Sequence, residues 1–177
     1  MSTTTVQTLP DLIDVLSKFV VPLIVAAFTA YFSTRFALNK FYKEKWWEKR
    51  LEAFTEVINI AYRIKMTNDY FLNCENAKMD QDDSRFKPHP KNIEDKLSVE
   101  YWIDIQELER IAQLADFTLT SKVKSILDVY VKDRRKIEND YYEGAIESLE
   151  VSEQDFKLSQ KLLSDLVLEA KNELKIT

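Results

Sequence analysis

The chain has 177 residues with one glycine and four prolines, which favours an almost entirely helical protein, and its one cysteine, Cys74, excludes a disulfide framework and a cysteine-rich zinc site. Residues 1–50 carry seven Lys and Arg against four Asp and Glu, a net +3, whereas residues 51–177 have a net −8. This acidic body disfavours broad nucleic-acid binding, because neutralising phosphates needs a basic face, and we expect no direct sequence-specific nucleic-acid binding.

The apolar segment 18–39 is predicted to be a transmembrane helix. No charge occurs in the 16 residues from Phe19 to Thr34, and extending the count to Leu38 adds only Arg35. A helix over this stretch would be about 24–30 Å long, against roughly 30 Å for the hydrocarbon core of a bilayer. Because no polar residue interrupts residues 19–28, the segment is apolar on all sides rather than along one stripe.

Two alternatives to a membrane span are open. The core helix of a soluble protein can have the same length and composition. A cleaved signal peptide is disfavoured, because the leader before Lys18 holds Asp11 and Asp14 where a basic region is expected.

The flanks of this segment indicate its orientation. Charged side chains at its two ends can reach opposite interfaces, and aromatic rings suit the interfacial belt. The expected membrane-interface residues are Lys18, Arg35, Tyr42, Lys43, Trp46 and Trp47. A basic cluster follows the span, at Lys40, Lys43, Lys45, Lys49 and Arg50. The positive-inside rule then places residues 1–17 outside a bacterial inner membrane and residues 40–177 in the cytoplasm.

Small side chains recur at helical spacing along one side of the predicted span. This ridge consists of Ala26, Thr29 or Ala30, Ser33 and Ala37, and most of the bulky side chains lie on the other side. Because a ridge of small side chains lets helices approach closely in lipid, we expect a homo-oligomer packed along it. A chance run of small residues is the alternative.

Residues 40–177 are predicted to form an antiparallel bundle of about four helices. The membrane helix is expected to continue to about Cys74, since apolar side chains recur in steps of three and four from Trp47 to Ala61. Residues 76–92 are polar and contain two prolines, so a loop is expected there.

Three further helices complete the predicted bundle. One covers residues 93–118. The next is capped by Thr120 and ended or bent by Gly144. The last opens at Ser152, which resembles a capping box together with Asp155.

Signals for catalysis are nearly absent. His89 is the only histidine, and its position in the loop before Pro90 favours an ordinary surface residue over a catalytic base. One glycine cannot supply a phosphate-binding loop, and the carboxylates are spread along helix surfaces as solvated charges. We therefore expect no enzymatic activity, no cofactor and no metal.

One amino-terminal membrane segment, a basic exit and an all-helical body together resemble the accessory membrane protein found beside the RNA-guided RNase in type VI-B CRISPR loci. The resemblance covers the plan of the whole chain rather than a motif. It implies a divergent HEPN-like bundle, whose active RNase relatives carry Arg, four to six residues, then His. Arg134 and Asn139 have this spacing, as do Arg63 and Asn68, but an Asn cannot act as a general acid or base.

The resemblance also implies a function. It implies an oligomeric membrane pore that supports antiviral defence by disturbing the envelope when the partner RNase is engaged, with membrane lipids, other copies of the chain and that RNase as partners. Thr29, Ser33 and Lys40 are able to line a lumen. A membrane-tethered helical binding module without conductance and a HEPN-like RNase are the open alternatives.

Overall fold

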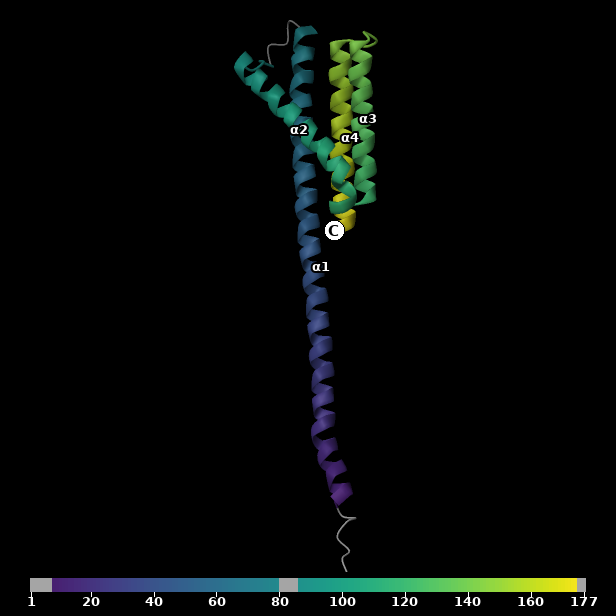
Figure 1. The fold of residues 1–177 in the computed structure, drawn as a ribbon. Coiled ribbons are helices and arrows are strands. Elements are labelled where there is room, and N and C mark those ends of the chain that lie inside the picture. The colour runs from purple at the N-terminus through teal and green to yellow at the C-terminus, as the bar shows by residue number, and fades with distance from the viewer. Residues whose placement is uncertain (1–7, 80–85, 175–177) are drawn as a thin grey trace, which may run out of the picture. The chain divides into compact units, whose positions relative to one another are not determined.

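A computed structural model describes residues 8–79 and 86–174 of the chain. These residues form four helices and contain no strand: α1 (Thr8–Met79), α2 (Lys91–Thr118), α3 (Ser121–Tyr142) and α4 (Ser148–Leu174), shown in Figure 1. The prediction of an all-α protein with one long apolar amino-terminal helix is confirmed. The chain divides into two units, Met1–Glu48 and Lys49–Thr177, and α1 contributes residues to both.

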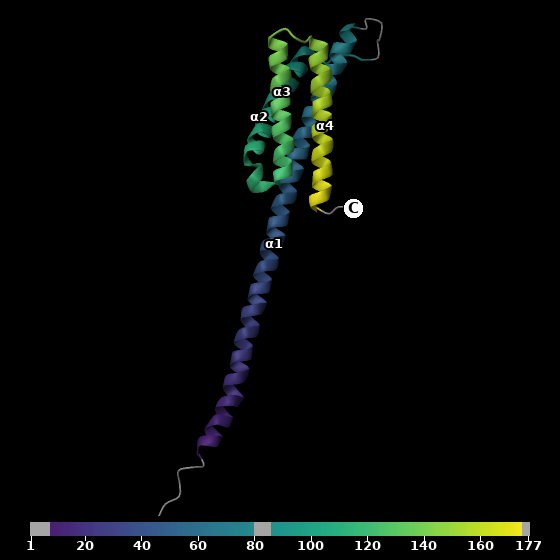
Figure 2. The same cartoon turned by 90° about the vertical axis from the view of Figure 1, so that its right-hand side faces the viewer.

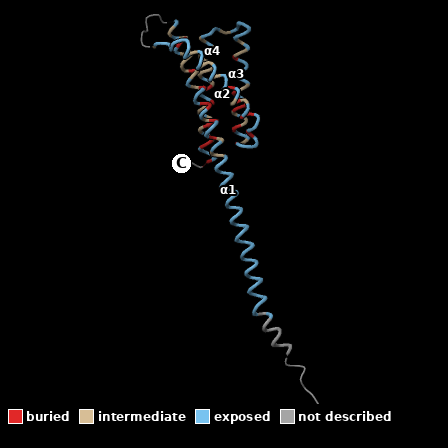
Figure 3. Tube along the Cα trace, turned by 60° about the vertical axis from the view of Figure 1, so that its left-hand side comes forward, coloured by how far each residue is buried: buried red, intermediate tan, exposed pale blue. Residues whose placement is uncertain are grey.

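The first unit consists, in its described part, of α1 up to Glu48. Every residue from Lys18 to Glu48 is exposed, and Figure 3 shows this part of α1 in the colour of exposed residues. Because α1 begins at Thr8 rather than near Lys18, Pro22 lies inside the helix. Proline has no amide hydrogen, so Pro22 cannot donate the usual hydrogen bond to the carbonyl one turn earlier.

The second unit is a helical bundle built around an apolar core. Figures 1 and 2 both show α3 and α4 side by side, and the short turn between them makes them antiparallel. On α1 the buried side recurs in steps of three and four residues, as expected for one face of a helix. Its members in this unit are Phe54, Val57, Ile60, Ala61, Ile64, Asn68 and Cys74. Corresponding buried residues on the other helices include Leu108, Ala115, Leu127 and Leu166.

The start of α3 confirms a predicted cap, whereas the start of α4 does not. Thr120 Oγ1 accepts a hydrogen bond from the amide of Val123 at 3.2 Å, which satisfies one of the amides left unpaired at a helix start. The helix beginning predicted at Ser152 is wrong, because α4 already begins at Ser148 and Ser152 lies inside it. The Val151 amide already donates to the Glu147 carbonyl at 3.0 Å, so the hydrogen-bonded turns start earlier.

The connection between α1 and α2 is shorter than the predicted loop 76–92. Helix α1 continues to Met79, α2 begins at Lys91, and residues 86–90 are the described non-helical part. Tyr70 holds this part in place. Its hydroxyl accepts a hydrogen bond from the His89 amide at 2.8 Å and donates one to Glu94 at 2.7 Å, and its ring stacks on the His89 ring with centroids 4.8 Å apart.

Gly144 is the residue that lets the chain leave α3. Its φ of 71° lies in the left-handed region that glycine adopts without a steric penalty. The Gly144 amide donates to the Tyr141 carbonyl at 2.9 Å, and the Ala145 amide donates to the Asp140 carbonyl at 2.8 Å. These two bonds satisfy carbonyls at the helix end, so the predicted role of Gly144 as a terminator is confirmed.

Candidate functional site

The first candidate site is the exposed apolar part of α1. A window of 18 residues in this helix is long and apolar enough to cross a membrane, and none of that window is buried inside the chain. Large apolar side chains are open along it, such as Phe19 at 73% exposure and Phe28 at 61%. In the described structure this apolar segment is therefore not part of the hydrophobic core.

Two unlike faces run along this segment. At about 100° per residue, Ala26, Ala30, Ser33 and Ala37 fall on one side of the helix, and we call them the small ridge. The opposite side carries bulky side chains, namely Ile24, Phe28, Tyr31 and Phe32. The rings of Phe28 and Phe32 stack on each other at 6.4 Å, and the rings of Tyr31 and Phe32 meet edge to face at 5.6 Å.

The hydroxyl groups of this segment are partly satisfied by the helix itself. Thr29 Oγ1 donates to the Val25 carbonyl and Thr34 Oγ1 donates to the Ala30 carbonyl, each at 2.8 Å. Such bonds to the preceding turn let a threonine enter lipid without a bare polar group. Ser33 makes no side-chain hydrogen bond among the described residues, so its hydroxyl is open to a neighbouring helix.

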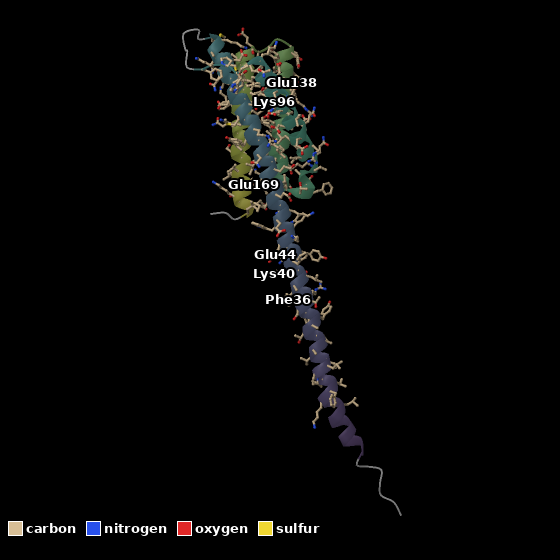
Figure 4. The ribbon with its side chains drawn as sticks, turned by 90° about the vertical axis from the view of Figure 1, so that its left-hand side faces the viewer. Phe36, Lys40, Glu44, Lys96, Glu138 and Glu169 are labelled. Carbon is tan, nitrogen blue, oxygen red and sulfur yellow. The ribbon has the colours of Figure 1, made fainter. Side chains whose placement is uncertain are left out.

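The predicted interfacial residues are exposed, and several basic side chains within and just beyond the apolar segment have polar partners. Arg35 Nη1 donates to the Tyr31 hydroxyl at 3.4 Å. Lys40 lies 3.8 Å from a carboxylate oxygen of Glu44, and Figure 4 labels this pair. Lys45 donates to Glu48 at 2.6 Å, and this hydrogen bond raises the pKa of Lys45.

The aromatic side chains of the predicted interfacial belt are open as well. The exposed fractions are 66% for Tyr42, 53% for Trp46 and 47% for Trp47. Exposing rings of this size to water costs free energy. The headgroup region of a bilayer suits their mixed polar and apolar character. Trp47 also borders a shallow surface pocket with Lys43, Glu44 and Glu48.

The second candidate site is a buried polar cluster around Arg134 in the second unit. Arg134 is 7% exposed, and its guanidinium carbon lies 4.8 Å from the centre of the Trp102 ring. Its Nη1 lies 3.7 Å from a carboxylate oxygen of Glu138. Its Nε has no hydrogen-bond partner among the described residues. A buried donor left unpaired costs free energy.

Asp155 on α4 completes this cluster. Burial raises the pKa of Asp155 to about 6, although the Arg134 guanidinium lowers it, and the Glu138 carboxylate contributes to the rise. The Asn68 amide on α1 donates to the Asp155 backbone carbonyl at 3.1 Å. The cluster therefore joins side chains from all four helices, since Trp102 belongs to α2 and Arg134 to α3.

The same residues surround a cavity of about 210 Å³. Its lining combines charged groups with aromatic and aliphatic ones: Tyr101, Trp102, Arg134, Ile137, Glu138, Tyr141, Tyr142, Val151 and Asp155. Aromatic walls with a few convergent polar groups are typical of a binding site. Among the described residues, no group of three or more His, Cys, Asp and Glu side chains is arranged to hold a metal ion.

Arg134 and Asn139 are not brought together as a side-chain pair. Arg134 is buried, whereas Asn139 is exposed and offers its backbone carbonyl to the Glu143 amide at 2.9 Å. His89 stacks on Tyr70 in the α1–α2 connection. Trp102 and Asp155 were not predicted as site residues from the sequence.

One signal in the sequence points to the buried cluster. Arg134 follows Tyr130 by four residues and precedes Ile137 by three, so it occupies a core position of the apolar seam on α3. A charged residue at such a position is buried and needs partners. No comparable spacing leads to Asp155, because its partners come from other helices.

Comparisons of the chain with protein-family models, with curated proteins and with solved structures give no match. The function is therefore argued from the chemistry of the two sites.

Proposed function

We propose that this chain is an oligomeric membrane pore, in which residues 18–39 cross a bilayer and copies associate along the small ridge. The observation that carries this proposal is the exposure of every residue from Phe19 to Thr34 on a helix of this length. In water these apolar side chains would remain hydrated at a large free-energy cost, roughly 25 cal/mol for each Å². A bilayer removes that cost, and the helix satisfies its own backbone polar groups within it.

The two faces of the segment support association rather than a lone anchor. Lipid tails are as apolar as the bulky face, so burying that face against another helix adds no hydrophobic stabilisation. The small ridge allows the backbones of two helices to approach closely, and Ser33 can hydrogen-bond across the contact. Thr29 and Lys40 lie next to the small ridge on the same side of the helix. Both side chains could therefore face a lumen.

The charges support an orientation with residues 40–177 in the cytoplasm of a bacterium. The segment from Arg35 to Arg50 carries six Lys and Arg against two Glu, and these follow the apolar stretch. Cytoplasmic flanks are enriched in Lys and Arg, and the anionic lipid surface there attracts such a cluster. In this proposal the amino terminus lies outside the inner membrane.

The proposed setting is antiviral defence beside an RNA-guided RNase, with a HEPN-like second unit that does not cut RNA. The plan of the chain supports it: an apolar amino-terminal helix, a basic exit and an all-helical body with an acidic charge. Coexpression with a type VI-B RNase and its guide provides the test. Membrane permeability to a vital dye should rise only when a matching target RNA is present, and a rise without target would contradict this setting.

A membrane-tethered binding module is the second candidate, favoured by the hydrogen bonds of Thr29 and Thr34. Because both hydroxyls donate to carbonyls of their own helix, neither requires a water-filled lumen. In such a module α1 would serve as an anchor only, and the second unit would recruit a partner.

Ion flux through vesicles containing the purified full chain distinguishes the two candidates. The pore predicts flux together with an oligomer in detergent, measured by light scattering. Ala30→Leu and Ser33→Leu should reduce oligomer size and flux together, because a bulky side chain on the small ridge keeps helices apart. The matched controls on the bulky face, Ile24→Leu and Phe28→Leu, should leave both quantities close to those of the wild type.

Each outcome decides between the candidates. If the ridge variants keep both oligomer size and flux, the small ridge is not the packing face. If the wild type is monomeric and does not conduct even with its activating partner, the pore is refuted and the tethered module remains.

A further inference from the structure

One carboxyl group of the buried cluster has no partner among the described residues. Asp155 on α4 lines the cavity of about 210 Å³ together with Arg134 and Glu138 of α3. Its side chain is partly buried and makes neither a hydrogen bond nor an ion pair within the described structure. Only its backbone carbonyl is engaged, by the Asn68 amide at 3.1 Å. A carboxyl group in such surroundings is less costly when it holds a proton than when it is charged.

Arg134, the cation of the same cavity, is engaged by α2 and α3. Its guanidinium carbon lies 4.8 Å from the centre of the Trp102 ring, and its Nη1 lies 3.7 Å from Glu138, which Figure 4 labels. A separation of 3.7 Å is longer than a charge-assisted hydrogen bond, so this pair is a loose one. The guanidinium is therefore open to competition from a second carboxylate of the same chain.

The proton of Asp155 is set between two charges of opposite sign. Burial has the largest influence and raises the pKa of Asp155 to about 6. The Arg134 guanidinium lowers this pKa, whereas the Glu138 carboxylate raises it. Arg134 thus favours the ionised form of Asp155, and Glu138 favours the protonated form.

The other ionisable and polar groups around Asp155 keep their charge near pH 6. They are Asn68 and Lys65 on α1, Tyr101 on α2, Tyr130, Tyr141 and Tyr142 on α3, and Glu153 on α4. Tyrosine hydroxyls are neutral near this pH, and burial raises the pKa of Tyr101 and of Tyr130 further. Lys65 and Glu153 are each paired with an opposite charge, at 3.3 and 3.0 Å. A change of charge near pH 6 in this cluster is therefore assigned to Asp155.

From this geometry we propose that Glu138 and Asp155 exchange the Arg134 guanidinium, according to whether Asp155 holds a proton. With Asp155 protonated, Arg134 remains against Trp102 and Glu138, as in the described arrangement. With Asp155 ionised, the guanidinium moves to Asp155 on the same cavity and leaves the Trp102 ring. The cavity provides the room for this movement, and the new ion pair compensates the partly buried charge.

The exchange changes which helices the buried cation connects. In the first arrangement Arg134 connects α3 to α2 through Trp102. In the second it connects α3 to α4, whose backbone at Asp155 is held to α1 by Asn68. The result is a pH-sensitive change of packing inside the second unit. It goes beyond the proposed pore and does not depend on it, since every residue involved belongs to that unit.

NMR spectroscopy of the full chain in detergent tests the exchange, with fluorotryptophan and isotope-labelled arginine as probes. The Trp102 fluorine signal should titrate with a midpoint at or just below about pH 6, because pairing with Arg134 stabilises the ionised carboxyl. The Arg134 Hε signal should move downfield over the same range as the guanidinium gains a charged acceptor. Trp46 and Trp47 belong to the first unit and are the internal controls, whose signals should not follow this titration.

Three substitutions identify the group that titrates. Asp155→Asn should abolish the titration of both signals. Glu138→Gln should keep the titration but lower its midpoint by about one pH unit, because a neighbouring negative charge is lost and Arg134 is released. Glu153→Gln is the matched control, since it removes a carboxylate of α4 that does not line the cavity, and it should leave the midpoint unchanged.

Each remaining outcome contradicts the proposal. If neither signal titrates between about pH 4 and 7.5, or if both still titrate in Asp155→Asn, Asp155 does not control the cluster. If the Trp102 signal follows Asp155 while the Arg134 signal stays in place, the proton is exchanged without a change of partner. Should Asp155→Asn fail to fold, an unchanged midpoint in Glu138→Gln refutes the competition between the two carboxylates.

Discussion

Arg63 on α1 and Asp104 on α2 form a two-point ion pair, in which Arg63 Nε donates to the two carboxylate oxygens of Asp104 at 2.9 and 3.2 Å. The two partners are unequally buried, because the Asp104 side chain is 11% exposed and the Arg63 side chain is 55% exposed. The hydrogen bond to Asp104 raises the pKa of Arg63. The buried Asp104 carboxylate therefore needs its ion-pair partner more than the exposed Arg63 guanidinium does.

This inequality predicts different costs for removing each partner. Arg63→Ala leaves a buried carboxylate without its cation and should lower the free energy of unfolding by about 2–3 kcal/mol. Asp104→Asn leaves Arg63 open to water and should cost about 1 kcal/mol or less. Chemical denaturation of both variants followed by circular dichroism measures the difference, and equal costs would show that the burial of Asp104 is irrelevant.

The buried carboxyl of Asp155 predicts a pH dependence of stability. Its pKa is raised to about 6, so the folded state holds this proton more tightly than the unfolded chain. The contribution of the carboxyl to stability is therefore complete below about pH 4 and is lost as the pH rises through 6. Burial raises this pKa most, the Arg134 guanidinium lowers it, and the Glu138 carboxylate raises it further.

Asp155→Asn should remove this dependence. The variant should be more stable than the wild type at pH 8, by on the order of 1–3 kcal/mol, and the difference should vanish below pH 4. Thermal unfolding across pH 4–8 provides the measurement. Parallel profiles for the wild type and the variant would mean that another group titrates in this range.

The charge pattern predicts the membrane orientation. A fluorescent protein that matures in the cytoplasm should be bright at the carboxyl terminus, and alkaline phosphatase at the same place should be inactive. Replacing Lys43, Lys45 and Lys49 by Glu should lower the fluorescence and raise the phosphatase activity, because it removes the basic flank. An active phosphatase fusion of the wild type, or wild-type protein in the soluble fraction, would contradict the proposed topology.

The position of His89 predicts that it serves the fold rather than catalysis. His89→Ala removes the ring that stacks on Tyr70 and should cost about 0.5–1.5 kcal/mol of stability, while the backbone amide still donates to the Tyr70 hydroxyl. Purified wild-type chain should leave single-stranded RNA intact on a gel. Cleavage by the wild type that disappears in His89→Ala would establish an RNase instead.

Local chemistry allowed much of the fold to be predicted. One glycine and four prolines indicated a helical chain, and Thr120 was recognised as a cap because its hydroxyl accepts from an amide three residues away. The steps of three and four identified the buried side of α1 only in part, since Phe54 and Ala61 are buried whereas Trp47 is 47% exposed. The start of α4 was misplaced at Ser152, because the hydrogen-bonded turns already begin before it and the Val151 amide donates to the Glu147 carbonyl.

The apolar stretch, its small ridge and its basic end can be predicted from the sequence alone. Hydrophobicity, side-chain size and charge along one helix follow from residue order and 3.6 residues per turn. Only the tertiary structure brought Asp155, Trp102 and Arg134 together and left the Arg134 Nε without a hydrogen-bond partner among the described residues. These residues are far apart in the chain, and burial, which raises the pKa of Asp155, exists only after the four helices have packed.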